Sequence, residues 1–336
     1  MIIQTAELND IDNKSIKKQN LWTWFPVTFL AALFGCVLWG SASPAIKIAY
    51  DLFGIASDDT ASRIMLAGAR FIIAGIMTIV FGSIINRRFL VPKRTSYRAI
   101  LILACLQTVG QYYFFFMALA HTTGVRGSII NAAGNFLTIV SAVFIFRMEK
   151  MTVRKLLGCV VGFSGIILIL GGASAFMSGS EITLAGEGAM LIADIFYALS
   201  GCCIKIFSKD EDPVVLSGYQ FFIGGIVLFV IGCVMGGTLT FSNMMCVWNL
   251  LYMGFISAGA YTVWGILLKH NPVSRVSILG FMNPVLGVLL SALLLGENNE
   301  AFSITGVMAL VLVSLGIVIV NFNGHTGQEE KSPKME

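Results

Sequence analysis

Charge is scarce in this chain. Only 12% of its 336 residues are Asp, Glu, Lys or Arg, whereas 57% are hydrophobic; in a soluble domain about 25% are charged. A soluble protein of this length needs a charged surface, but a surface that faces lipid has to be apolar because no water solvates charge there. The composition therefore excludes an ordinary soluble domain and indicates that the bilayer is the solvent.

Several kinds of site are also missing. The seven cysteines lie in apolar stretches without Cys-x-x-Cys spacing, and the three histidines have no ligand partner at a usable distance in the sequence, so we expect no disulfide framework, no metal and no cofactor. The basic residues are not clustered, which argues against a nucleic-acid partner. Because the hydrolase, metalloprotease and ATP-binding motifs are absent, we expect no enzyme and no ATP-driven pump.

Ten apolar stretches are long enough to cross a membrane as helices, which takes about 20 residues. They predict an all-α integral membrane protein with spans near 28–50, 62–86, 98–120, 127–146, 156–174, 184–207, 213–235, 246–268, 276–295 and 302–321. If the amino terminus is inside, 18 of the 22 Lys and Arg residues fall on inner segments, where basic residues are retained. We therefore expect a multi-pass protein of the plasma membrane with both tails, 1–27 and 322–336, in the cytoplasm.

The chain also matches itself at an offset of 148 to 158 residues. Tyr112 corresponds to Tyr261 and Asn135 corresponds to Asn283, and such matches follow the order of the spans. We therefore predict two five-helix repeats, residues 28–174 and 184–321. Since each repeat has an odd number of spans, the second must cross the membrane in the opposite direction. Inverted repeats can exchange inward-open and outward-open shapes around a site between them.

Short motifs accompany this architecture. The first span contains Trp39-Gly40-Ser41 and Pro44-Ala45-Ile46-Lys47, the second contains Ala69-Arg70-Phe71, and Gly296-Glu297 closes the ninth. With these motifs, the chain from about residue 28 to 322 resembles the EamA-like family of the drug/metabolite transporter superfamily. Met148-Glu149 departs from the Gly-Glu pattern of the family in the first repeat. The resemblance implies export or exchange of amino acids, nucleotide-related compounds or other small metabolites.

Ionisable groups inside the spans are costly, and each is therefore a candidate for function. Asp194 lies near the midplane of the sixth span and shares a helix face with Tyr197; it is a candidate proton-coupling carboxylate. The alternative is a structural ion pair with Arg70. For Arg70 we favour this pair over binding of a substrate carboxylate or phosphate.

Further candidates are polar or aromatic residues at helical spacing. Trp39, Ser43 and Lys47 follow one another at four-residue steps in the first span, and we expect Lys47 to extend to the membrane interface. Asn135 and Asn283 lie beside the helix breakers Gly134 and Pro284 at equivalent positions of the two repeats, which points to a transport site; hydrogen bonding between helices is the alternative. The pairs Asn131 with Asn135 and Gln107 with Gln111 predict a polar cavity lined by the third and fourth spans, and Tyr261 completes the candidate set.

Together these features predict a secondary transporter, either an exporter or a uniporter, of small polar metabolites. Amino acids are the first substrate class, and alternating access of the two repeats is the expected mechanism. Nucleotide-related or drug-like compounds are the alternative substrates, and a membrane receptor or scaffold that does not transport is the alternative class. The expected partners are a small solute and the lipid bilayer, and the sequence leaves a homo-oligomer open.

Overall fold

The structure, a computed structural model, describes residues 21–148, 150–170, 183–271, 276, 279–280 and 282–321. All regular elements in these residues are helices, so the all-α prediction is confirmed for this part of the chain. Seven helical segments in it are long and apolar enough to cross a bilayer, and two further apolar helices are shorter. Glu149, the end of the fifth predicted span and most of both predicted tails lie outside the described residues.

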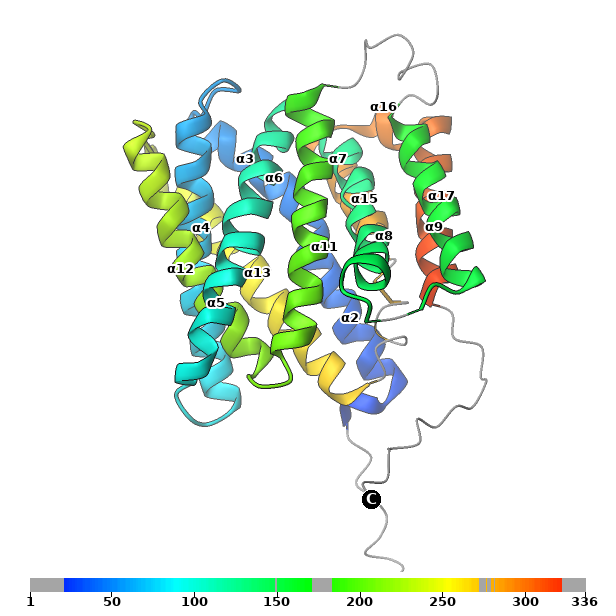
Figure 1. The fold of residues 1–336 in the computed structure, drawn as a ribbon. Coiled ribbons are helices and arrows are strands. Elements are labelled where there is room, and N and C mark those ends of the chain that lie inside the picture. Colours follow the sequence, from blue (N-terminus) through cyan, green and yellow to red (C-terminus); the bar gives the residue numbers. More distant parts are fainter. Residues whose placement is uncertain are drawn as a thin grey trace, which may run out of the picture.

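The helices form a single bundle (Figure 1). In the residues before 171, which we call the first half, they are η1 (Leu21–Thr23), α2 (Phe25–Gly40), α3 (Ala42–Phe53), α4 (Thr60–Ile85), η2 (Arg94–Ser96), α5 (Tyr97–Leu103), η3 (Ala104–Gln111), α6 (Tyr112–His121), α7 (Gly124–Ile130), α8 (Ala133–Val140), η4 (Ser141–Ile145) and α9 (Val153–Ile169). In the residues from 183 onward, which we call the second half, they are η5 (Leu184–Gly188), α11 (Ala189–Phe207), α12 (Pro213–Val234), α13 (Met244–His270), α15 (Met282–Leu295), α16 (Asn298–Ala301) and α17 (Ile304–Asn321).

Polar residues at the helix ends explain where several spans begin. At the start of α4, the carboxylate of Asp59 accepts a hydrogen bond from the amide of Ser62 at 2.9 Å. At the start of α12, Asp212 accepts from the amide of Val214 at 2.8 Å, and Pro213 occupies the first turn. These side chains satisfy amides that have no carbonyl partner within the helix.

Glu211 fixes the connection before α12 to the loop before α5. Its carboxylate accepts from the amides of Lys93 at 2.8 Å and Asp212 at 3.0 Å, and from the hydroxyl of Ser96 at 2.9 Å. Burial raises the pKa of Glu211, but these hydrogen bonds outweigh burial and hold the pKa below its ordinary value. Glu211 is therefore ionised at neutral pH and joins the two halves at this corner of the bundle.

Close glycine contacts define how α4 and α12 pack, which is the most extensive helix contact in the described structure. A Cβ on Gly75 would lie 2.5 Å from the amide nitrogen of Phe222, and a Cβ on Gly225 would lie 2.5 Å from that of Ile72. Only glycine permits this approach. Gly225 and Phe222 stand 150 residues after Gly75 and Ile72, so the two contacts are equivalent, with the roles of the two helices exchanged. Residues later in α4 contact residues earlier in α12. The two helices therefore run antiparallel, side by side in Figure 1.

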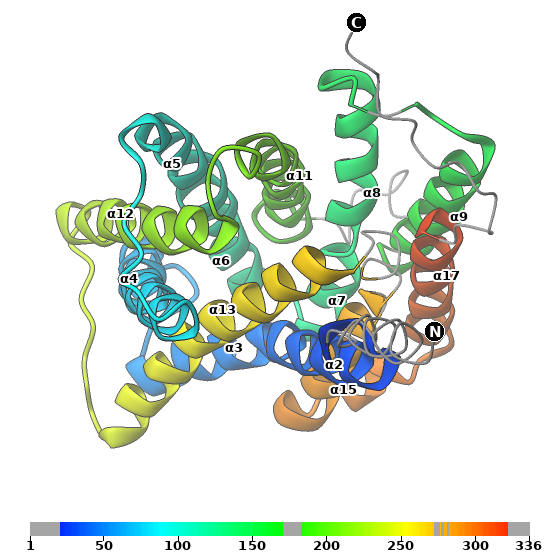
Figure 2. The ribbon, with the colours of Figure 1, turned by 90° about the horizontal axis from the view of Figure 1, so that it is seen from below.

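The contacts between the halves are also reciprocal on a larger scale. In the first half α2 packs on α13 of the second, and correspondingly α11 packs on η3 and α6. α9 and α17 pack mainly on each other at one edge of the bundle, away from α4 and α12 (Figure 2). The middle of the bundle is therefore formed by α2, α3, α6, α7, α8, α11, α13 and α15.

Three of the predicted spans are interrupted within this middle region. α2 and α3 are separated at Ser41, and α7 and α8 are separated at Asn131 and Ala132. α15 begins at Met282 after a turn at Gly280. A helix that loses its four-residue hydrogen-bond ladder exposes backbone polar groups, and inside a membrane such backbone is tolerated where protein or a cavity surrounds it.

Candidate functional site

A small cavity lies where the helix breaks meet. Its volume is about 30 Å³, enough for about two water molecules. Five predicted site residues lie on its wall, namely Trp39, Ser43, Asn131, Asn135 and Asn283. The rest of the wall is formed by Gly40, Phe115, Ser128, Ala132, Pro284 and Gly287. Both halves of the chain therefore contribute to one polar cavity.

The two repeat-equivalent asparagines occupy matching backbone turns in this wall. The amide of Asn135 donates to the carbonyl of Ala132 at 3.2 Å, and the amide of Asn283 donates to the carbonyl of Gly280 at 3.1 Å. The same three-residue bond thus occurs twice at an offset of 148 residues, in place of the four-residue bond of an α-helix. Asparagine side chains offer both donors and acceptors, so this wall can hydrogen-bond to either kind of group on a small polar solute.

An aromatic and amide network lies beside the cavity. The ring of Trp39 is 5.5 Å from the ring of Tyr261 and 5.0 Å from that of Trp264, measured between centroids. The hydroxyl of Tyr261 accepts from Gln107 Nε2 at 3.0 Å, and Gln107 Oε1 accepts from Gln220 Nε2. Because Gln107 is engaged in this network, it does not line the cavity as its spacing predicted.

Arg70 is fully buried away from the cavity. Its guanidinium donates to the carbonyl of Met253 and to the hydroxyl of Ser257, both at 3.2 Å, and lies over the ring of Phe71 at 5.0 Å. No ion pair joins Arg70 to Asp194 among the residues that the structure describes, so the favoured structural pair is not formed. Two of its nitrogens are hydrogen-bonded, the aromatic faces of Phe71 and Tyr112 lie near the cation, and Nη1 has no hydrogen-bond partner among the described residues.

Asp194 lies behind the break between α7 and α8. The residue is 1% exposed, and neither carboxylate oxygen has a hydrogen-bond partner in the described part of the chain. A Cβ on Gly134 would lie 3.3 Å from Asp194 Oδ1 and 2.8 Å from Tyr197 Cδ1, so Asp194 and Tyr197 both press against this glycine. Gly134 stands between the cavity residues Ala132 and Asn135, which places the carboxylate next to the cavity wall.

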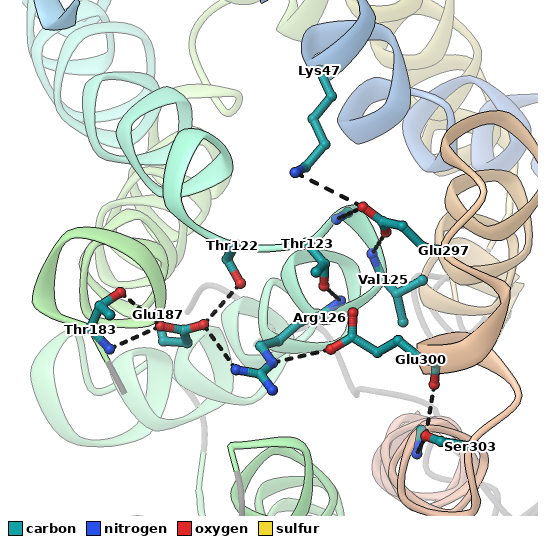
Figure 3. Close-up of polar contacts among 12 residues, drawn as sticks. Lys47, Thr122, Thr123, Val125, Arg126, Thr183, Glu187, Glu297, Glu300 and Ser303 are labelled. Carbon is teal, nitrogen blue, oxygen red and sulfur yellow. Dashed lines mark hydrogen bonds and ion pairs between the residues drawn. The ribbon is translucent and has the colours of Figure 1, made fainter. Parts of the chain in front are cut away.

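Five ionisable residues form a charged cluster at one end of the bundle, the end at which α7 begins: Lys47, Arg126, Glu187, Glu297 and Glu300 (Figure 3). We call this end the charged end. The three ion pairs found in the described structure all belong to the cluster: Lys47 Nζ lies 3.9 Å from Glu297, and Arg126 lies 3.3 Å from both Glu187 and Glu300. Each pair joins the first half to the second.

Neutral groups complete the cluster. Glu297 accepts hydrogen bonds from the amides of Gly124 at 2.9 Å and Val125 at 2.8 Å. Its carboxylate therefore caps the start of α7. Glu187 accepts from the hydroxyls of Thr122 at 2.9 Å and Thr183 at 3.0 Å. Charge-assisted bonds of this kind are about twice as strong as neutral ones. The cluster therefore joins α3, the start of α7, η5, and the segment from the end of α15 to α16.

The remaining candidates differ from expectation in their contacts. Lys47 was expected to extend to the membrane interface, but its ammonium points to Glu297 (Figure 3). Gln111 is buried without lining the cavity. The residues of the cluster that are not among those predicted as site residues are Arg126, Glu187, Glu297 and Glu300, because their ion-pair partners are far away in the chain. The sequence signal that could have found them is that each is an ionisable residue at the end of a span.

Comparisons with known proteins agree with this architecture. The signature of the EamA-like transporter family matches residues 27–171 and again residues 184–322. An uncharacterised transporter of Synechocystis is 28% identical over 87% of this chain and 88% of its own length. A probable amino-acid metabolite efflux pump of Escherichia coli is 27% identical over 86% of this chain and 92% of its own length.

A solved crystal structure also has a similar fold. It covers 86% of this chain and 94% of its own, with a TM-score of 0.61 and 16% identity, so the likeness concerns the fold alone. The double family match spans most of the sequence, and it coincides with the two halves whose contacts are reciprocal. The chain belongs to the EamA-like transporter family.

Proposed function

We propose that this protein is a secondary transporter of small polar metabolites, with amino acids as the first substrate class, and that it works by alternating access. The observation that carries the proposal is the polar cavity at the helix breaks, to which both halves contribute. The family and its relatives point to transport and not to an enzyme.

The two halves are proposed to be inverted repeats of five spans each, residues 28–174 and 184–321. The antiparallel packing of α4 and α12, which are equivalent spans, supports this arrangement. So does the direction of α2, which rises in Figure 1 while its equivalent α11 descends. Two opposed copies of one unit can exchange shapes, so that the cavity opens first to one side and then to the other.

The charged end is proposed to be the outer end, and both tails to be cytoplasmic. The distribution of Lys and Arg supports this orientation, because most of them lie on the opposite side. In this structure the charged cluster joins the two halves across the outer end. We propose that it is a gate, which closes the cavity on that side and opens when its cross-half contacts separate.

The choice of amino acids rests on two observations. Asn131, Asn135 and Asn283, with the hydroxyls of Ser43 and Ser128, offer paired donors and acceptors suited to ammonium and carboxylate groups. Relatives from Escherichia coli and Salmonella typhimurium are named probable amino-acid metabolite efflux pumps. Nucleotide-related or drug-like compounds are the second substrate class.

The test begins with a metabolite panel screened by thermal shift, followed by uptake into proteoliposomes. We expect saturable uptake of at least one amino acid, and counterflow when the vesicles are loaded with the unlabelled compound. Binding without any movement into sealed vesicles would instead identify a receptor or scaffold. Non-saturating flux without counterflow would identify a channel.

A further inference from the structure

The buried carboxylate of Asp194 has no role in the contacts described so far. Both of its oxygens are enclosed, and no described residue donates a hydrogen bond to either of them. It is unlike Glu187 and Glu297, which are held by amides, hydroxyls and cations. A group this costly inside a membrane indicates a function.

Burying an ionised carboxylate without partners in such a place is far more costly in free energy than burying the neutral acid. The enclosed geometry therefore suits a carboxylic acid that carries a proton. We propose that Asp194 is a proton-binding site, and that binding and release of this proton couple transport to a proton gradient. This inference rests on the proposed transport function, and it adds the coupling ion.

The charged and titratable groups around Asp194 do not provide a counter-ion. α8, which packs on α11, has no ionisable side chain. Tyr197 is the titratable neighbour one turn further along α11. The other groups on the elements packed on α11 are Tyr97 and Arg98 of α5, Cys105 of η3, Tyr112, Tyr113 and His121 of α6, Arg126 of α7, and Glu187 of η5; of these, Arg126 is paired with Glu187 and Glu300.

Gly134 supplies the link to the cavity. Because Asp194 Oδ1 would be only 3.3 Å from a Cβ at Gly134, the backbone beside the break between α7 and α8 covers the carboxylate, and the inference requires that a shift of this backbone exposes the carboxylate to the cavity. Water can then take the proton and leave an ionised, hydrated carboxylate. Coupling requires that the proton is bound from one side of the membrane and released to the other. The empty protein then changes shape with Asp194 protonated, and the solute-loaded protein changes shape without that proton, so one proton crosses in exchange for each solute.

The protonation state can be read without transport. Full-length protein labelled with carbon-13 aspartate is reconstituted in lipid, and infrared difference spectra are recorded against pH. We expect a protonated carboxyl band at neutral pH that shifts with the isotope and is lost in Asp194→Asn, but is kept in Asp58→Asn, in which an exposed aspartate is changed. If the wild-type protein has no such band at neutral pH, the inference is overturned, whatever the stability of the variants.

Coupling is then tested in proteoliposomes with a mixture of radiolabelled amino acids. With a pH gradient of about one unit, one proton per solute supports up to about tenfold accumulation. We expect Asp194→Asn to lose this accumulation and to keep counterflow, which needs no gradient. Unchanged accumulation in the variant, or accumulation driven by sodium alone, would overturn the inference. Absence of counterflow in the wild type would instead count against the proposed transport function.

Discussion

The proposed gate predicts a defined effect for Glu297→Gln. The variant keeps the size of the side chain but turns a carboxylate that accepts from two amides, at 2.9 and 2.8 Å, into a neutral group with one oxygen. One amide then has no acceptor, which costs about 1–3 kcal/mol, and the other amide keeps a hydrogen bond that is weaker because its acceptor is no longer charged. The ion pair to Lys47 is partly exposed and adds less than about 1 kcal/mol.

If the charged end is a gate, these losses together weaken its closed state by about 3 kcal/mol, which corresponds to a shift of up to about a hundredfold in the ratio of open to closed molecules. The assay uses Ser43→Cys in the cavity wall, in a background without the seven native cysteines, and an impermeant maleimide added from outside. The labelling rate reports the population that is open to that side. Glu297→Gln should raise it by as much as a hundredfold.

The matched control is Asp58→Asn, an exposed carboxylate in the loop between α3 and α4 at the same end of the bundle. It removes the same charge but no contact of the charged cluster, so the labelling rate should stay within about twofold of the parent. If Glu297→Gln labels no faster than Asp58→Asn while both are equally folded by size-exclusion chromatography, the charged cluster is not a gate.

Three further predictions concern other parts of the molecule. Asn135→Ala and Asn283→Ala should each raise the half-saturation concentration of uptake by up to about tenfold, which corresponds to the loss of one hydrogen bond, and should leave the yield of folded protein unchanged. Loss of folded protein alone would favour helix packing as their role. Gly134→Ala should lower the free energy of unfolding by about 1–3 kcal/mol, because the added methyl group overpacks on Tyr197. Gly201→Ala should not, since the nearest atom to a Cβ at that position is 3.8 Å away. The stabilisation by Glu211 should be present above the ordinary glutamate pKa of about 4.3 and be lost as the pH falls through its lower folded pKa. The difference in melting temperature between wild type and Glu211→Gln should therefore shrink from about pH 6 to about pH 3; a difference that is independent of pH would contradict this role.

The helices and the asparagine pair were within reach of sequence reasoning. Long apolar stretches have one stable solution in lipid, which is a helix, so their positions follow from composition alone. Asn135 and Asn283 could be paired because the repeat places them at one offset next to helix breakers. Their side chains line one cavity, as that pattern suggested, although their role in binding stays a prediction.

The contacts between distant segments were not within reach. Arg70 and Asp194 have opposite charges inside the predicted spans, which suggests an ion pair, but the rotation of each helix decides whether the two side chains meet. Arg70 instead donates hydrogen bonds to Met253 and Ser257. Gln107 and Gln111 were placed on one face by four-residue spacing, yet η3 is a π-helix over Ala104–Gln111, in which five-residue bonds rotate the face. The charged cluster depends on pairs up to 250 residues apart, as between Lys47 and Glu297, which no local pattern reports.

The proposed opposed orientation of the two halves can be tested directly, because it would place equivalent loops on opposite sides of the membrane. Phe89 follows α4 and Thr240 follows α12, and both side chains are exposed. In intact cells that make the cysteine-free protein with Thr240→Cys or Phe89→Cys, an impermeant maleimide should label the cysteine at 240 and should reach the one at 89 only after permeabilisation. If both positions react from the same side, the halves are not inverted, and alternating access between them has no structural basis.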